Sequence, residues 1–190
     1  RAGRPYLGWS LALHGESLIS YDKTLAQRMF EEGIVLLRES GDTWRLGIAL
    51  NLFGDLTATQ GDLNLAHALQ SESLAVLRKA GDVLGAALAT NSFGLVLYRL
   101  GDYGLARTHF EEALAIFRAA GLRIGIAHTL RHIGHIAFVE GEYQQAAQCY
   151  HENLVIEREI GSREGIAWGI VYLAIAVRYM GDLAHAMELW

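Results

Sequence analysis

Glycine returns every twenty residues along most of this chain, and self-similarity of this kind indicates a repeat architecture. The series comprises Gly41, Gly61, Gly81, Gly101, Gly121, Gly141, Gly161 and Gly181. Asp follows the glycine five times, as Asp42, Asp62, Asp82, Asp102 and Asp182. Glycine adopts the left-handed conformation that ends a helix at no steric cost, and an Asp carboxylate accepts hydrogen bonds from the unpaired amides of the next first turn. Each glycine is therefore predicted to mark a corner between two helices.

The segments between these corners have apolar residues three and four positions apart, which predicts helices with one apolar stripe each. Alternate segments resemble each other more than neighbours do, so the repeating unit is a pair of helices. Arg38, Arg78, Arg118 and Arg158 recur forty residues apart, each in the last turn of a second helix, where a cation is favoured. We therefore expect one array over residues 1–190, with repeats at 1–40, 41–80, 81–120, 121–160 and an incomplete one at 161–190. The apolar helical pattern still runs at Trp190, which predicts an excerpt of a longer protein.

The repeat resembles the tetratricopeptide repeat (TPR). That motif has a small residue at its eighth position, which falls on Gly54, Gly94 and Gly134, whereas His14 and Ala174 take this place in the outer pairs. Its aromatic position falls on Phe30, Phe110, Tyr150 and Trp190, and Gln70 interrupts this series. The resemblance implies an all-α fold, a right-handed α-solenoid of antiparallel helix pairs in which each pair buries its stripe against its neighbours.

The forty-residue unit, with phrases such as "GDYGLARTHFEEALAIFRAAG", is similar to the C-terminal sensor arrays of signal-transduction (STAND-type) ATPases and LuxR-type transcription regulators. This resemblance implies a surface that receives an inducer or a partner protein. A nucleotide-binding domain elsewhere in such a protein acts on the signal.

Composition excludes several classes of function. The formal net charge of -5 opposes binding to a phosphate backbone, so no direct nucleic-acid partner is expected. Cys149 is the only cysteine, which rules out an internal disulfide and favours a reducing, cytoplasmic compartment. The longest apolar run, Gly165 to Val177, is shorter than a membrane span, so no membrane partner is expected. Motifs for phosphate binding, nucleophilic catalysis and metal hydrolysis are missing, so we expect no enzyme and no cofactor.

One polar cluster carries four side chains at helical spacing, His128, Arg131, His132 and His135, which share one face of a helix. Because roughly 10 Å of helix rise separates His128 from His135, at most two neighbouring histidines could hold one zinc ion. We therefore predict no metal site and favour an inner wall of the solenoid.

The first helix of every pair is expected to face the concave side of the array. The predicted ligand-binding groove there comprises Asn51, Asp55, Asn91, Tyr98, His128, Arg131, His132, His135, Phe138, Trp168, Tyr172 and Arg178. Asn can bind a peptide backbone, Arg a carboxylate, and Trp and Tyr offer anchoring area. Two structural alternatives stay open: ordinary packing for Trp168 and Tyr172, and a solvated helix face for the asparagines.

Together these observations predict a non-catalytic array that binds a protein or peptide, as the sensor or interaction module of a larger signalling ATPase or transcription regulator. One alternative is a receptor domain for a small-molecule inducer. Another is a self-association scaffold, in which Leu183, Met187 and Leu189 form an apolar end that pairs with another molecule.

Overall fold

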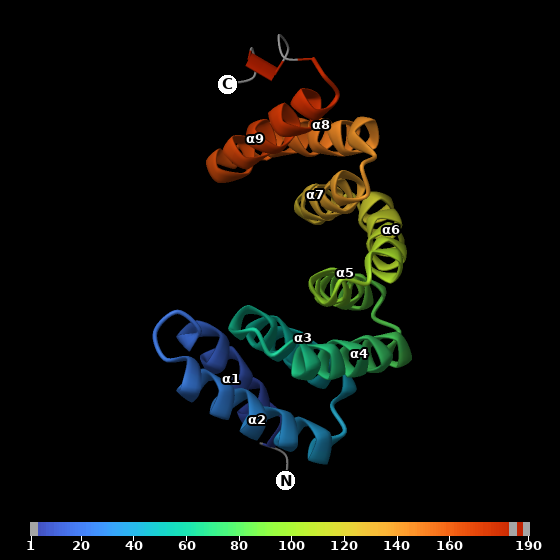
Figure 1. Ribbon diagram of the computed structural model, residues 1–190. Helices are drawn as coiled ribbons and strands as arrows, with labels where there is room; N and C mark the ends of the chain where they lie inside the picture. The colour runs from blue at the N-terminus through green and yellow to red at the C-terminus, as the bar shows by residue number, and fades with distance from the viewer. Residues whose placement is uncertain (1–3, 183–185, 188–190) are drawn as a thin grey trace. The chain divides into compact units, whose positions relative to one another are not determined.

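The computed structural model describes residues 4–182, 186 and 187, and this part of the chain contains α-helices and no strand (Figure 1). The helices are α1 Arg4–Leu18, α2 Lys23–Ser40, α3 Thr43–Gln60, α4 Leu63–Ala80, α5 Val83–Leu100, α6 Tyr103–Ala120, α7 Arg123–Val139, α8 Tyr143–Ile160 and α9 Arg163–Tyr179. In Figure 1, α1 and α2 lie side by side as a hairpin, as do α3 and α4. The predicted all-α fold of helix pairs is confirmed.

The chain divides into two compact units, Arg1–Gly101 and Asp102–Trp190. The N-terminal unit contains α1 to α5, and the C-terminal unit contains α6 to α9. The organisation of residues 1–190 as one continuous array of forty-residue repeats stays a prediction.

The corners have the structure that the glycine series predicts. Gly61, for example, has φ of 91° and its amide donates to the Ala58 carbonyl, so a residue with a Cβ would be strained there. The next residue, Asp62, accepts a hydrogen bond of 3.0 Å from the Leu65 amide. The same side-chain cap occurs at Asp22, Asp42, Asp82, Asp102 and Ser162. Leu122 and Glu142 make no such bond.

The first helix pair packs closely although His14 takes the place of the expected glycine. His14 is exposed, and glycines at other positions bring the backbones together. A Cβ on Gly8 would lie 2.8 Å from the Gly33 oxygen, and one on Gly15 would lie 3.0 Å from the Ala26 oxygen. The small residues therefore sit in a shifted register in this pair.

Each unit has its own apolar core. In the N-terminal unit, Phe30 of α2 and Phe53 of α3 stack at 5.4 Å, beside the fully buried Leu37 and Leu50. The C-terminal core gathers residues of α7, α8 and α9 and one residue beyond them: Ala137, Ala146, Tyr150, Leu154, Leu173, Ala176, Val177 and Ala186.

Two of the arginines at the ends of second helices, Arg38 and Arg118, also link successive second helices. Arg38 on α2 donates to both carboxylate oxygens of Glu72 on α4, at 2.8 and 2.7 Å. Arg118 on α6 does the same with Glu152 on α8, at 2.7 and 2.9 Å. The sequence pattern predicts only a favourable interaction of these arginines with the helix dipole. It does not predict the ion pairs, because each Glu partner lies 34 residues away in the chain.

Among the described residues, α5 has the length and hydropathy of a membrane-spanning helix. Its buried residues, including Ala86, Ala89 and Leu97, pack within the N-terminal unit. A buried core helix meets the same criteria of length and composition, so they are weak evidence for a membrane span.

Candidate functional site

The predicted groove residues lie on the first helices of the pairs and are distributed over both units. Four belong to the N-terminal unit: Asn51 and Asp55 on α3, and Asn91 and Tyr98 on α5. The others belong to the C-terminal unit: His128, Arg131, His132, His135 and Phe138 on α7, and Trp168, Tyr172 and Arg178 on α9. Each unit brings its own residues together as described below. The prediction that all of them line one groove stays a prediction.

In the N-terminal unit, Gln70 of α4 is the centre of a polar network. Its Nε2 donates to the Asp55 carboxylate at 2.9 Å and to the Asn51 carbonyl at 3.0 Å. The Asn51 amide donates to Gln70 Oε1 at 2.7 Å. Because Nε2 faces two acceptors and Oε1 faces a donor, the orientation of the Gln70 amide is fixed by its partners. The network thus holds two predicted residues, Asn51 and Asp55, in defined positions.

Glycine explains why Gln70 fits at this place. A Cβ on Gly54 would lie 2.6 Å from Gln70 Nε2, so α3 must have a glycine for α4 to bring this side chain close. The sequence shows Gln70 as an interruption of the aromatic series. That interruption is the signal that points to the network, although the sequence analysis did not place Gln70 in the site.

The second carboxylate oxygen of Asp55 faces α5, where the Ser92 hydroxyl donates to it at 3.3 Å. Burial raises the pKa of Asp55 to about 6, although the hydrogen bonds from Ser92 and Gln70 act in the opposite direction. Ser92 was not predicted as a site residue. Two predicted residues lie half-buried on the same helix, α5: Asn91, which is next to Ser92 in the chain, and Tyr98.

In the C-terminal unit, aromatic and imidazole rings form a continuous stack, the aromatic ladder. His132 stacks on Phe110 at 5.1 Å and meets His135 at 6.3 Å. His135 contacts the Tyr172 ring edge to face at 4.5 Å, and Tyr172 stacks on Trp168 at 5.6 Å. Trp168 is 46% exposed, so the ladder ends at the surface.

The histidines of the ladder are uncharged near neutral pH. Burial, followed by the nearby Arg131 charge, lowers the pKa of His132 to about 3 and that of His135 to about 4. The pKa of His128 is lowered by the same two effects, partial desolvation first and the Arg131 charge second. The polar cluster predicted from the sequence contains these three histidines and Arg131, and its positive charge near neutral pH rests on the arginine.

Gln70–Asp55 and Tyr150–His135 occupy equivalent positions eighty residues apart. In the C-terminal unit, a hydrogen bond of 2.8 Å joins His135 Nδ1 and the Tyr150 hydroxyl. Here too a glycine makes room, because a Cβ on Gly134 would lie 2.6 Å from the Tyr150 ring. Both repeats therefore connect their two helices through a polar contact beside the eighth-position glycine.

Of the remaining predicted residues, Phe138 and Arg178 lie near the ends of α7 and α9, and Arg131 lies in the middle of α7. Phe138 contacts Tyr143 at 5.4 Å and Tyr179 at 5.1 Å, so it belongs to a second aromatic cluster. Arg178 is exposed and Arg131 is half-buried. Within the described ranges, no group of three or more His, Cys, Asp or Glu side chains is arranged to hold a metal ion.

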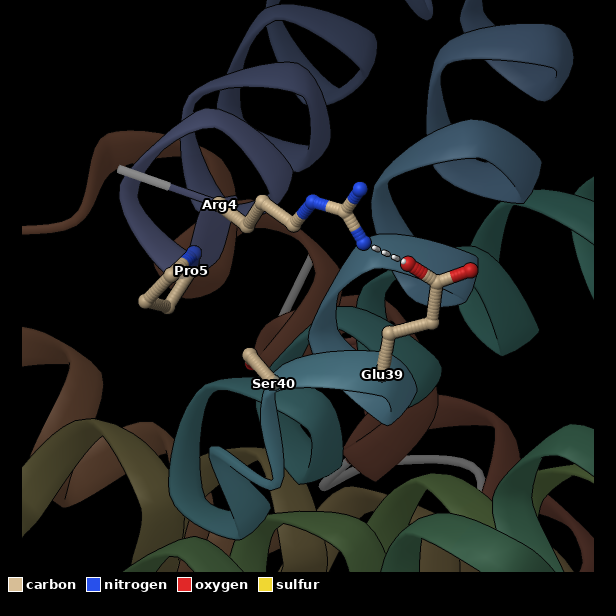
Figure 2. A pocket seen from close by; sticks show the side chains of 4 residues that line it. All are labelled: Arg4, Pro5, Glu39 and Ser40. Atoms are coloured by element: carbon tan, nitrogen blue, oxygen red, sulfur yellow. Dashed lines mark hydrogen bonds and ion pairs between the residues drawn. The ribbon is translucent and has the colours of Figure 1, made fainter. Parts of the chain in front are cut away.

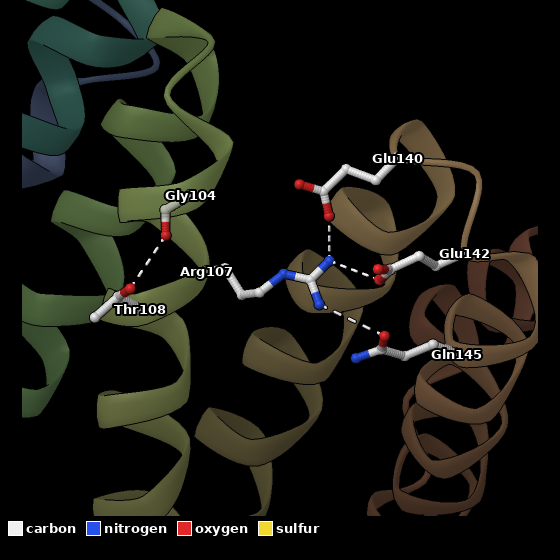
Figure 3. A network of polar contacts seen from close by, with 6 residues as sticks. All are labelled: Gly104, Arg107, Thr108, Glu140, Glu142 and Gln145. Carbon is white, nitrogen blue, oxygen red and sulfur yellow. Dashed lines mark hydrogen bonds and ion pairs between the residues drawn. The ribbon is translucent and has the colours of Figure 1, made fainter.

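Three clusters outside the prediction add to the polar and aromatic surface. Figure 3 shows Arg107 of α6 bound to Glu140 and, at 2.9 Å, to Glu142 at the corner between α7 and α8. Figure 2 shows a pocket lined by Arg4, Pro5, Glu39 and Ser40, with Arg4 and Glu39 paired at 2.7 Å across it.

The third cluster lies where α1 and α3 meet. The ring centres of Trp44 and Trp9 lie 6.1 Å apart, and Trp44 Nε1 donates a hydrogen bond of 2.8 Å to the Asp82 carboxylate. The Arg45 guanidinium lies 5.3 Å from the centre of the Tyr6 ring. The sequence pattern does not indicate these three clusters, because the partners in their contacts lie 33 to 38 residues apart in the chain.

Comparison with known proteins supports the repeat assignment. Residues 45–119 match the model of the tetratricopeptide repeat. No curated protein shows significant similarity to the chain.

Solved structures show the same fold over almost the whole chain. A variant of a Podosopora anserina protein with nearly identical TPR-like repeats superposes with a TM-score of 0.81 and 13% identity, over 98% of this chain and 92% of that one. A Rap protein complexed with competence and sporulation factor superposes with a TM-score of 0.79 and 15% identity, over 98% of this chain and 52% of that one.

A signal transduction ATPase with numerous domains and a tetratricopeptide repeat sensor, from Pyrococcus horikoshii, gives a TM-score of 0.79 and 16% identity, over 97% of this chain and 29% of that one. The chain therefore spans about half of the Rap protein and less than a third of the ATPase. Residues 45–119 thus match the tetratricopeptide repeat, and the solved structures show the same TPR-like fold over almost the whole chain.

Proposed function

We propose that this chain binds a protein or peptide partner through the first helices of its pairs. The observation that carries this proposal is Trp168, which is half-exposed and rigidly backed by Tyr172 and His135. An exposed aromatic ring held by stacking offers anchoring area at little cost in conformational entropy. Tetratricopeptide repeats generally serve as non-catalytic interaction scaffolds, and the Rap protein of similar fold is complexed with competence and sporulation factor.

The parent protein that we propose is a cytoplasmic signalling ATPase or transcription regulator, in which this array is the sensor or interaction module without cofactor. The similarity to the sensor-containing ATPase from Pyrococcus horikoshii supports this proposal. The net charge of -5 supports a protein partner over nucleic acid.

Selection of peptides from a random display library against the full chain tests the proposal. We expect selected peptides to bind more weakly to Arg131→Ala, Asn91→Ala and Trp168→Ala, each by roughly tenfold, with little change in melting temperature. Tyr21→Ala is the matched control, because Tyr21 is an exposed aromatic residue in the loop between α1 and α2. Unchanged affinity in all three groove variants would remove the site assignment.

Self-association is the alternative that has a structural observation in its favour. Met187 is 78% exposed, whereas Leu183 and Leu189 of the predicted apolar end lie outside the described residues. Light scattering over a range of concentrations distinguishes self-association from peptide binding. Self-association is favoured if the chain associates, if Met187→Glu abolishes this association, and if no peptide is selected. The inducer-receptor alternative predicts stabilisation by a small molecule in a thermal-shift screen and no selected peptide.

A further inference from the structure

Asp55 has a half-buried side chain whose carboxylate accepts hydrogen bonds from neutral groups. Gln70 and Ser92 donate to its two oxygens, and both donors are uncharged. Among the described residues, no Lys, Arg or His contributes to the environment that shifts its pKa. Arg4, Arg38 and Arg45 of the same unit form ion pairs with other carboxylates.

This arrangement is costly for the isolated protein. A buried charge is normally paired, and hydrogen bonds from neutral donors compensate only part of its lost hydration. The raised pKa of Asp55 reflects the same cost, with burial as the largest cause. A cationic group that reached this carboxylate would remove the cost and form a charge-assisted hydrogen bond.

The geometry leaves Asp55 able to accept such a group. Each carboxylate oxygen has two lone pairs, and each accepts one hydrogen bond from the protein. Gln70 is itself fixed by Asn51, so the carboxylate is held in position before any ligand arrives. The Asp55 side chain is half-buried on α3, so the protein does not enclose it completely.

We propose that the N-terminal unit binds the side chain of a Lys or Arg residue of the partner peptide at the Asp55 carboxylate, with Gln70 and Ser92 positioning it. This inference rests on the proposed function, because it names the chemistry of one group in that partner. It differs from the groove prediction in assigning a charge to the ligand at a particular place.

Two rounds of measurement test the inference. In the first, a random peptide library is selected against the full chain and against Asp55→Asn, which keeps the shape of the side chain but removes its charge and one of its two acceptor oxygens. We expect Lys or Arg to be enriched at one peptide position with the original chain and not with Asp55→Asn. Glu72→Gln is the matched control, because Glu72 is a carboxylate of the same unit that pairs with Arg38. Selection against this variant should enrich Lys or Arg in the peptides as strongly as selection against the original chain.

In the second, one selected peptide and its copy with norleucine for Lys, or citrulline for Arg, are titrated against both proteins by calorimetry. Loss of the charge should weaken binding about tenfold for the original chain and leave binding to Asp55→Asn nearly unchanged. An equal loss with both proteins, or selected peptides without a cationic preference, would overturn this inference and leave the proposed function intact. If no peptide is selected at all, the proposed function fails and this inference fails with it.

Discussion

Gln70 donates a hydrogen bond of 2.9 Å to Asp55 at the place in its repeat where Tyr150 and His135 are joined in the C-terminal unit. Each contact connects a second helix to a first helix beside a glycine. The two pairs differ in chemical type, so these two repeats have a polar contact at the same position but with residues of different charge and acidity. The following predictions test these contacts and the packing around them.

The Asp55 pKa predicts how stability depends on pH. This pKa is raised from 3.8 to about 6 in the folded state, so the folded chain holds the proton more tightly, and stability from this group is lost as pH rises through about 6. Asp55→Asn lacks this dependence. We expect the free energy of unfolding of the variant relative to the original chain to rise by about 1–2 kcal/mol between pH 5 and pH 7.5, measured by urea denaturation. A constant difference would contradict the burial of an uncompensated charge.

Gly54 is predicted to be required for the approach of Gln70. Gly54→Ala would place a Cβ 2.6 Å from Gln70 Nε2, so we expect a loss of about 1–3 kcal/mol in the free energy of unfolding. Gly104→Ala in α6 is the control, because a Cβ there meets no atom within 4 Å. The control variant should be unchanged or more stable by less than about 1 kcal/mol. Equal effects of the two substitutions in chemical denaturation would show that helix contact is not the cause.

Gln70 and Asp55 should be energetically coupled. Gln70→Phe restores the aromatic series but removes the donor to Asp55 and the partner of Asn51, so we expect a loss of about 1–3 kcal/mol. Asp55→Leu combined with Gln70→Phe reproduces the Leu95 and Phe110 of the following repeat, and this double variant should recover most of the loss. The measurement is a double-mutant cycle of unfolding free energies. Additive effects would show that the hydrogen bond does not couple the two residues.

The histidines of the aromatic ladder should destabilise the chain in acid. The pKa of His132 is lowered from 6.5 to about 3, so its contribution is fully present above pH 6.5 and is lost as pH falls toward 3. Burial is the largest cause of this lowered pKa, and Arg131, His135 and His128 add to it. His132→Phe keeps the stack on Phe110 without the titrating group. Between pH 6.5 and pH 4 we expect the melting temperature of the original chain, measured by circular dichroism, to fall by at least about 5 °C more than that of the variant. Parallel curves would contradict a buried neutral imidazole.

Two arginines with similar ion pairs are expected to differ in their effect on stability. Arg107 is 21% exposed and binds two carboxylates, so Arg107→Ala should cost about 1–3 kcal/mol in the free energy of unfolding. Arg38 is 50% exposed, so Arg38→Ala should cost less than about 1 kcal/mol despite its two-pronged contact with Glu72. Urea denaturation at low and high salt measures both losses. A larger loss for Arg38 would show that exposure does not decide the difference.

The sequence by itself determined the elements and their ends. Gly61 and Asp62 predict a corner between two helices, because the Gly61 backbone and the Asp62 carboxylate act on neighbouring residues and need no distant partner. The twenty-residue series therefore predicted the helices of this chain, and the forty-residue pattern predicted their pairing. The aromatic series also showed in advance that Gln70 was an exception.

Only the tertiary structure decided what the exceptions and the polar faces do. Helical spacing placed Asp55 and His135 on first helices, but their acidity depends on burial and on partners fifteen residues away, Gln70 and Tyr150. Periodicity likewise missed the close contact at Gly15 in the first pair, because the register of close contact is set when two helices meet. Capping is a local property of the chain, whereas desolvation and contact across helices exist only after the helices have packed, so the corners could be read from the sequence and the chemistry of the site could not.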